Sequence, residues 1–245
     1  MARLANKTAV ITGGTTGIGF ESAKLFIAEG ARVIITGRNE ARLAEAVEAL
    51  GPNAIGVKAD AQSLADIDYL ATHVREEFGQ IDILFANAGV AKRALFREVT
   101  EAHFDEEIGI NLKGVFFTVQ KLEPLMRDGS SVVLNTTTLA QTALHGEGIY
   151  SASKAAVRSL ARSLSLELLD RHIRVNAVAP GPIETPIWSK LELPVEVAEK
   201  VLSRTPIGRF GKPEEIAKVV LFLASDDSSY MLGEEILVDG GWATI

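Results

Sequence analysis

A tyrosine and a lysine lie four residues apart in Tyr150-Ser151-Ala152-Ser153-Lys154, at the start of a stretch with helical periodicity. Residues at this spacing share one face of a helix, one turn apart. A lysine ammonium beside a phenol favours the phenolate and is expected to lower its pKa from about 10 toward working pH. Such a phenol can exchange a proton with a carbonyl or alcohol oxygen. The pair therefore predicts acid–base chemistry on an oxygen atom.

A glycine-rich segment near the N-terminus follows one apolar run and precedes a helical pattern. Its spacing is Gly-x-x-x-Gly-x-Gly, and the absence of a following Gly-Lys-Ser/Thr excludes a P-loop. Gly13 permits a tight turn, Gly17 lets a pyrophosphate approach the backbone, and Gly19 lets the helix pack close to the sheet. The helix N-terminus offers free N–H groups to an anion. The predicted dinucleotide-binding residues of this turn are Gly13, Thr15, Thr16, Gly17, Ile18 and Gly19.

The end of the second apolar run indicates which dinucleotide is bound. Proteins that bind NAD place an Asp or Glu about 20 residues past the glycines, where it accepts the ribose 2′-hydroxyl. Here the run ends Thr36-Gly37-Arg38-Asn39, without a carboxylate. Gly37 leaves room, and the guanidinium of Arg38 suits a 2′-phosphate. The prediction is NADP(H) rather than NAD(H), with a solvated surface arginine as the alternative reading of Arg38.

Short apolar runs alternate with amphipathic stretches along the whole chain. The runs are continuous, as expected of parallel strands covered on both faces. This alternation predicts one α/β domain over residues 1–245, a doubly wound Rossmann fold with a seven-stranded, mostly parallel sheet and helices on both faces. The predicted strands are Thr8–Thr12, Arg32–Thr36, Ala54–Ala59, Asp82–Ala86, Ser131–Asn135, Ile173–Ala179 and Glu235–Val238.

Composition excludes several classes of protein. The chain has 245 residues, a formal charge of −7, no cysteine and four scattered histidines. A net negative charge without a basic block argues against nucleic acid or an anionic membrane surface as a partner. Without cysteine or paired histidines, no metal site is predicted. The longest apolar run, Val219–Ala224, is too short to span a bilayer, and no signal peptide is evident, so we predict a cytoplasmic protein.

One long irregular stretch, Pro180–Pro194, carries four prolines and directly follows a predicted strand. Open α/β sheets bind ligands at the carboxyl ends of their strands, so a substrate lid over about residues 185–205 is predicted. Trp188 could wall the substrate pocket or only anchor the lid to the domain. The apolar residues expected in this lid are Ile187, Trp188, Leu191 and Leu193.

Several motifs, in order along the chain, resemble those of the short-chain dehydrogenase/reductase family, and the resemblance covers nearly all of the sequence. It includes the glycine-rich turn and the Tyr150–Lys154 pair. Asp60-Ala61 after the third strand resembles the family's adenine-binding pair. Asn87-Ala88-Gly89 is similar to the motif that steadies the sheet beside the cofactor. Asn111 takes the place of an asparagine whose backbone holds a water linked to the lysine.

Two further segments near the C-terminus carry the same resemblance. Pro180-Gly181 with Thr185, and Ile183 between them, is similar to the segment that contacts the nicotinamide end of the cofactor. Asp239-Gly240-Gly241 resembles the family's C-terminal motif near its usual subunit interface. By resemblance, the protein is expected to be a homo-oligomer, most simply a tetramer.

The resemblance implies an NADP(H)-dependent oxidoreductase that transfers a hydride between nicotinamide and a small-molecule carbonyl or secondary alcohol. In this scheme Tyr150 exchanges the proton, and Lys154 holds the nicotinamide ribose and keeps the tyrosine acidic. Asn111 and a water connect Lys154 to solvent. Sugars, steroids, ketoacyl compounds and small ketones all remain open as substrates.

One position departs from the family pattern. The family has a serine 13 residues before the tyrosine, where this chain has Thr137, inside Asn135-Thr136-Thr137-Thr138. A threonine hydroxyl can donate to a substrate oxygen, but its methyl restricts χ1 and narrows the pocket. Thr137 is predicted to orient the substrate oxygen, with Thr138 or no threonine as alternatives. This departure also keeps open a catalytically silent NADP(H)-binding regulator, or a structural oligomer, of the same fold.

Overall fold

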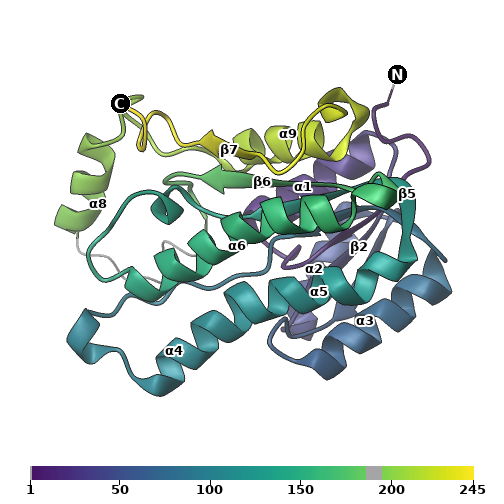
Figure 1. Ribbon diagram of the computed structural model, residues 1–245, viewed down its shortest axis with the longest axis horizontal. Coiled ribbons are helices and arrows are strands. Elements are labelled where there is room, and N and C mark those ends of the chain that lie inside the picture. The colour runs from purple at the N-terminus through teal and green to yellow at the C-terminus, as the bar shows by residue number, and fades with distance from the viewer. Residues whose placement is uncertain (1, 186–194) are drawn as a thin grey trace.

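The computed structural model describes residues 2–185 and 195–245 (Figure 1). In this part of the chain, seven strands form one sheet in the order β3-β2-β1-β4-β5-β6-β7, and every neighbouring pair is parallel. The order reverses between β1 and β4, which creates the crevice where doubly wound sheets bind ligands. The strands are β1 (Thr8–Ile11), β2 (Arg32–Gly37), β3 (Ala54–Lys58), β4 (Ile81–Ala86), β5 (Met126–Asn135), β6 (Arg174–Pro180) and β7 (Glu235–Val238).

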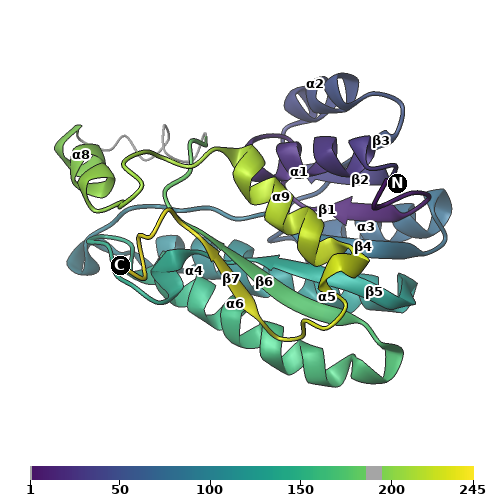
Figure 2. The ribbon, with the colours of Figure 1, turned by 90° about the horizontal axis from the view of Figure 1, so that it is seen from above.

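Helices cover both faces of this sheet. The described helices are α1 (Gly17–Ala28), α2 (Glu40–Leu50), α3 (Leu64–Glu77), α4 (Glu101–Ile108), α5 (Val115–Leu122), α6 (Gly148–Glu167), α8 (Val195–Ser203) and α9 (Pro213–Ala224). Figure 2 shows α1, α2 and α9 on one side of the sheet and α4, α5 and α6 on the other. The predicted doubly wound Rossmann architecture is confirmed.

Local sequence signals start several of these helices. The side chains of Asn39, Ser63 and Thr100 each accept a hydrogen bond from the backbone N–H three residues later, at 2.9, 3.2 and 3.2 Å. Asparagine, serine and threonine are favoured at this position because they satisfy an N–H that the helix leaves unpaired. Pro213 occupies the first turn of α9, where its missing N–H costs nothing.

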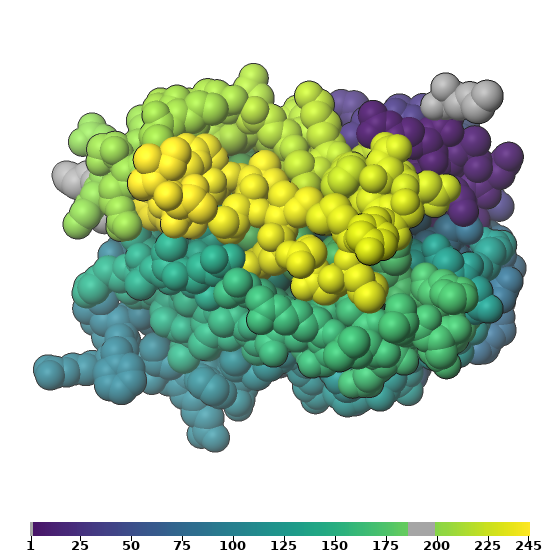
Figure 3. Space-filling model, turned by 45° about the horizontal axis from the view of Figure 1, so that its top comes forward, coloured from purple at the N-terminus to yellow at the C-terminus, as the bar shows by residue number. Residues whose placement is uncertain are grey.

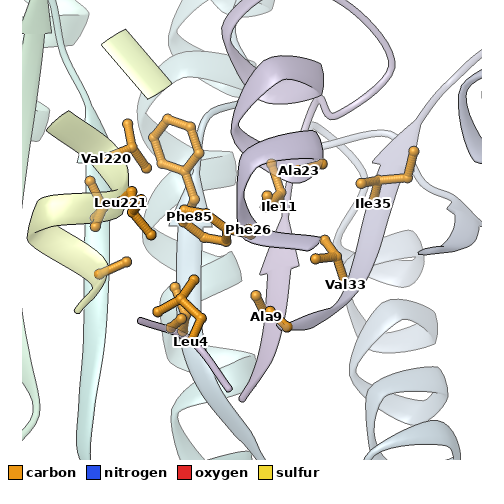
Figure 4. Close-up of a cluster of buried hydrophobic side chains, with 14 of the residues drawn as sticks. Leu4, Ala9, Ile11, Ala23, Phe26, Val33, Ile35, Phe85, Val220 and Leu221 are labelled. Carbon is orange, nitrogen blue, oxygen red and sulfur yellow. The ribbon is translucent and has the colours of Figure 1, made fainter. Parts of the chain in front are cut away.

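Two hydrophobic cores lie on opposite faces of the sheet. Figure 4 shows the core on one face, where Phe26 of α1 and Phe85 of β4 meet Val220 and Leu221 of α9. On the other face, residues such as Val10 pack with α5 and α6. Successive strand residues point to opposite faces, so both must be apolar. This explains why the strands appear in the sequence as continuous apolar runs.

The predicted strand limits agree closely with the structure except at one strand. β5 begins at Met126 rather than Ser131, and its pairing with β4 shifts register between Ile81 and Ile83. The intervening Arg-Asp-Gly-Ser sequence is polar, and Gly129 has a φ of +81°. A search for apolar runs therefore misses this extended segment. Among the described residues, no helix is long and apolar enough to cross a membrane.

Candidate active site

The turn between β1 and α1 depends on the predicted glycines. Gly13 and Gly17 have φ values of +64° and +56°, which glycine adopts without steric cost. A Cβ at Gly19 would lie 2.3 Å from the carbonyl oxygen of Gly13, so no side chain fits there. Thr16, which precedes α1, makes no side-chain hydrogen bond to the first turn of the helix. The N–H groups of that turn are therefore left for an anion, as the sequence predicts.

The side chain of Asn87, just after β4, holds this turn in place. Its Nδ2 donates to the carbonyl oxygens of Thr12 and Gly13 at 3.0 and 3.1 Å. The Thr12 hydroxyl accepts in return from the N–H groups of Asn87 and Ala88, both at 3.0 Å. The amide of Asn135, at the end of β5, donates to Asn87 Oδ1 at 2.9 Å. The ends of β1, β4 and β5 are thus tied together, and neither Thr12 nor Asn135 was identified by sequence motifs.

Arg38 and Asp60 lie together at the far end of the same crevice. Arg38 Nη1 is 3.8 Å from a carboxylate oxygen of Asp60, and the Arg38 side chain is 56% exposed. An exposed pair at this distance contributes little, which leaves the guanidinium able to engage another anion. A Cβ at Gly37 would lie 2.5 Å from Cγ2 of Thr15. Gly37 is therefore required by the packing of the glycine-rich turn, beyond the room it leaves for a phosphate.

Lys154 is almost fully buried, at 2% exposure, beneath the floor of the crevice. Its Nζ donates to the carbonyl oxygen of Asn135 at 2.7 Å and lies 5.9 Å from the centre of the Tyr150 ring. Burial lowers the pKa of Lys154 to about 8. A Cβ at Gly89 would lie 3.2 Å from Nζ, so Gly89 leaves room for the ammonium. The structure brings Tyr150 and Lys154 to one face of α6, as their spacing predicts.

The expected low pKa of Tyr150 is wrong for this structure. Burial raises the pKa of the Tyr150 phenol above its usual value, and nearby Glu147 and Glu107 raise it further. The nearby Thr137 hydroxyl opposes these effects only in part. The ammonium of Lys154 is directed to Asn135, so it does not offset the cost of removing a phenolate from water. The tyrosine is therefore held in its protonated form.

The three threonines after Asn135 are all buried but have different surroundings. Thr137 lies close enough to Tyr150 to lower the pKa of the phenol, and its hydroxyl donates to the carbonyl oxygen of Pro180 at 3.4 Å. The Thr136 hydroxyl is directed away, 2.6 Å from a carboxylate oxygen of Glu235 and 2.9 Å from the carbonyl oxygen of Val178. Thr138 lines the same pocket as Thr137. Of the three hydroxyls, that of Thr137 is the one that interacts with the phenol.

Asn111 lies behind the crevice rather than in its wall. It belongs to a π-helical turn, Gly109–Gly114, that joins α4 to α5, and it is fully buried. Its Nδ2 donates to Val90 O at 2.8 Å and to Ser153 Oγ at 3.2 Å, while its Oδ1 accepts from Val90 N at 2.8 Å. The side chain thus fixes the loop after β4 against α6. π-Helical turns often occur at functional sites, where they displace one residue from the regular helix.

Two adjoining pockets meet at Tyr150. The first follows the glycine-rich turn, and the second is a mostly apolar hollow on the other side of the tyrosine. Ile18, Asn135, Tyr150 and Thr185 line both. Of the predicted site residues, the first pocket contains Gly13, Thr15, Thr16, Gly17, Ile18, Arg38, Asp60, Ala61, Asn87, Ala88, Gly89, Tyr150, Lys154 and Thr185.

The remaining predicted residues have other positions. Pro180, Gly181 and Ile183 line the second pocket, and Gly19 shapes the turn without lining either pocket. A Cβ at Gly181 would lie 2.5 Å from Cβ of Asp239, so this glycine lets the ends of β6 and β7 approach. Of the predicted lid, Thr185 and the segment from Val195 are described, and α8 lies in the latter. Ile187, Trp188, Leu191 and Leu193 lie outside the described residues.

The second pocket contains two polar residues that motif analysis missed, Glu147 and Trp242. Glu147 Oε2 and Trp242 Nε1 are buried without a hydrogen-bond partner. Burial raises the pKa of Glu147 to about 7, helped by the nearby charge of Glu107 and opposed by Arg93. Only the tertiary structure shows that Glu147 and Trp242 line one pocket, because Trp242 belongs to the C-terminal segment and is distant in sequence from Glu147. Figure 3 shows that segment in yellow, beside the green residues that follow α8.

The first pocket fits a dinucleotide. Its turn is a glycine cradle that a Cβ at Gly19 would fill, and its helix N-terminus is uncapped by Thr16. The guanidinium of Arg38 lies at one end and the Tyr150–Lys154 pair at the other. A phosphate-binding turn at the switch point of a doubly wound sheet is typical of nicotinamide cofactor sites.

Comparison with known proteins agrees with this geometry. A family model described as enoyl-(acyl carrier protein) reductase matches residues 13–243. The 3-oxoacyl-(acyl-carrier-protein) reductase FabG of Thermotoga maritima is 42% identical, covering 98% of both chains. Galactitol 2-dehydrogenase of Agrobacterium fabrum is 39% identical, again over 98% of each. A solved short-chain dehydrogenase/reductase from Brucella melitensis superimposes with a TM-score of 0.91 at 35% identity, covering 99% of each chain.

The fold and the paired pockets define a nucleotide-dependent oxidoreductase. The chain belongs to the short-chain dehydrogenase/reductase family, whose members use nicotinamide cofactors.

The burial of Glu147 predicts a pH-dependent stability. Its pKa in the folded protein, about 7, lies above the value of 4.5 expected when unfolded, so the native state binds more protons between these values and loses stability as the pH rises through them. Relative to Glu147→Gln, the wild type should lose about 2–3 kcal/mol of unfolding free energy between pH 4.5 and 8. Urea unfolding at both pH values measures this difference. If the difference in unfolding free energy between the wild type and Glu147→Gln is the same at both pH values, the prediction is wrong.

Proposed function

We propose that this protein is an NADP(H)-dependent oxidoreductase that interconverts a carbonyl compound and a secondary alcohol. The observation that carries the proposal is the position of the Tyr150 phenol, which lines both pockets and shares the second with Thr137. A substrate oxygen in the second pocket can reach both hydroxyls. Relatives named as a reductase and a dehydrogenase support the same class of reaction.

The nicotinamide supplies or accepts the hydride when the cofactor is bound, and the protein positions the groups around it. In reduction, Tyr150 gives its proton to the developing alkoxide; in oxidation, it takes the proton from the alcohol. A phenol that keeps its proton, as the raised pKa of Tyr150 indicates, is ready for the reductive direction. Thr137 donates a hydrogen bond to the same substrate oxygen and fixes its orientation.

Lys154 and Asn111 are proposed to position the groups around Tyr150. The Lys154 ammonium, which donates to the carbonyl oxygen of Asn135 and lies 5.9 Å from the centre of the Tyr150 ring, holds the nicotinamide ribose in this proposal. Asn111 holds the loop after β4 against α6 and so fixes the depth of Lys154. Proton exchange between Lys154 and solvent, through a water at the Asn111 backbone, belongs to the same proposal.

The selection of NADP over NAD is proposed from Arg38 and its surroundings. The described end of β2 carries no carboxylate to accept a ribose 2′-hydroxyl, and the Arg38 guanidinium is half exposed beside the first pocket. A 2′-phosphate there gains a charge-assisted hydrogen bond from the guanidinium. Asp60 accepts the N–H of Gln62 at 3.0 Å, which directs part of its carboxylate toward the backbone and away from the ligand.

Replacement of Tyr150 by phenylalanine tests the mechanism. Tyr150→Phe should lower kcat at least a hundredfold while NADPH affinity changes little, because general acid–base help is worth about 10²–10⁴. Consumption of NADPH, followed by absorbance over a panel of ketones and aldehydes, gives kcat, and quenching of its fluorescence gives affinity. Wild-type protein that binds NADPH but consumes none with any substrate would instead be a cofactor-binding regulator.

The threonine assignment has its own test. Thr137→Ala should lower kcat roughly ten- to a thousandfold, as expected for loss of one polarising donor. Thr137→Ser should keep or raise activity, since it retains the hydroxyl and removes a methyl. Thr138→Ala is the matched control and should have little effect on kcat. A silent Thr137→Ala together with an impaired Thr138→Ala would transfer the role to Thr138.

Substitution of Arg38 tests the choice of nucleotide. Arg38→Leu should raise the KM for NADPH roughly ten- to a hundredfold, the range for a hydrogen bond to a charged group, and leave that for NADH nearly unchanged. Arg42→Leu, an exposed arginine in the first turn of α2, is the control and should change neither. Steady-state kinetics with both cofactors decides the question. A higher kcat/KM with NADH than with NADPH in the unmodified protein would refute the assignment.

A homotetramer is proposed as the working form. Near β7, Tyr230 is fully exposed and Leu232 is 37% exposed, next to a sheet edge. A neighbouring subunit would cover these side chains and that edge. Light scattering at micromolar concentration should therefore give a mass of about four chains, and Tyr230→Glu should reduce it. A monomer in the unmodified protein would contradict this assembly.

A further inference from the structure

The second pocket contains an acid that the proposed mechanism does not use. Glu147 is 3% exposed and lines this pocket, yet its Oε2 has no hydrogen-bond partner. A buried carboxylate oxygen without a partner costs free energy, so such groups are rare unless something binds them. Among the described lining residues, Glu147 and Tyr150 are the only ones that ionise. The rest of the wall is largely apolar, formed by side chains such as Leu139, Leu144 and Val201.

The position of Glu147 relative to the phenol limits what it can contact. Glu147 immediately precedes α6 and stands three residues before Tyr150, a spacing that places both side chains on one side of the helix. Its charge raises the pKa of the Tyr150 phenol, which requires the two groups to be near each other. A substrate whose carbonyl oxygen meets Tyr150 therefore lies in the pocket that Glu147 also lines.

A donor lies in the same pocket. Trp242 is 6% exposed, and its Nε1 is also buried without a partner. The side chain of Asp239 fixes the turn that carries it, accepting from Gly241 N at 2.9 Å and Ala243 N at 2.8 Å. Arg204 lies 4.7 Å from the ring centre and holds the indole from behind. Two residues of the pocket wall, Glu147 and Trp242, thus each carry a buried polar atom without a partner.

We infer that Glu147 is a specificity-determining residue that accepts a hydrogen bond from a substrate hydroxyl next to the reacting carbon, so that the preferred substrates are α-hydroxy ketones and the corresponding vicinal diols. This inference rests on the proposed oxidoreductase function and names its substrate class. A hydroxyl supplies the donor that Glu147 Oε2 lacks. A plain ketone leaves that oxygen unpaired, and a site built for hydrogen bonds rejects such an analogue strongly.

Two ketones that differ by one oxygen atom test the inference. The wild type should reduce 1-hydroxy-2-butanone with a kcat/KM at least tenfold above that for 2-butanone. Glu147→Leu should remove this ratio by slowing the hydroxy ketone, and Glu147→Gln, which keeps an acceptor oxygen, should retain part of it. Glu101→Leu, an exposed glutamate in the first turn of α4, should behave as the wild type.

A binding measurement makes the test independent of turnover. In the presence of NADP, 1,2-butanediol should raise the Tm of the wild type more than 2-butanol does, and the difference should vanish in Glu147→Leu. The variant should fold, since replacing an unpartnered buried acid by an apolar side chain of similar size removes a cost.

Three outcomes overturn the inference. Equal kcat/KM for the two ketones would refute the preference and leave the proposed function intact, because the ketones would still be reduced. If the preference for the hydroxy ketone survives in Glu147→Leu, another residue determines it. An equal loss of activity with both ketones in that variant would make Glu147 a partner of nearby Arg93 rather than of substrate. Absence of turnover with every carbonyl compound would refute the proposed function, and the Tm comparison would still decide the role of Glu147.

Discussion

The amide of Asn87 is the contact on which the rest of the site depends. It joins the ends of three strands by donating to the backbone of the turn after β1 and accepting from Asn135 at the end of β5. The carbonyl of Asn135 in turn receives the buried Lys154 ammonium. The glycine-rich turn and the helix that carries Tyr150 are thus connected through two side chains. In the proposed mechanism, preorganisation of this kind keeps the cofactor and the proton donor in register without rearrangement at the moment of reaction.

Burial gives the site its electrostatic character. The pKa of Lys154 is lowered to about 8, that of Glu147 is raised to about 7, and that of Tyr150 is raised as well, each because the charged form loses its hydration. Each group is held nearer to its neutral form than it would be in water. A charge that develops at the substrate oxygen is correspondingly felt more strongly by all of them, since the surrounding medium screens it less. Burial of these ionisable groups lowers the free energy of unfolding, and the groups lie in the candidate active site.

Proteins that share this fold are named for different substrates. Relatives close to 40% identical over nearly the whole chain carry the names of an acyl-carrier-protein reductase and a galactitol dehydrogenase. The family framework therefore leaves the substrate open. In the proposed function, the wall beyond Tyr150 selects the substrate. That wall comes from the segment after β5, the segment after β6 and the C-terminal turn, which are far apart in sequence.

The sequence alone determined the succession of strands and helices along the chain, because strands covered on both faces appear as continuous apolar runs. It also determined the glycine-rich turn and the tyrosine–lysine pair, because these follow from local spacing. It failed at the start of β5, where a polar Gly129 segment interrupts the apolar pattern, and for the acidity of Tyr150, because desolvation depends on every element packed around the phenol. Only the tertiary structure showed that Lys154 is held by the Asn135 carbonyl, that Gly37 makes room for Thr15, and that Glu147 and Trp242 share a pocket. Contacts between residues distant in sequence carry no local signal, and burial is a property of the whole fold.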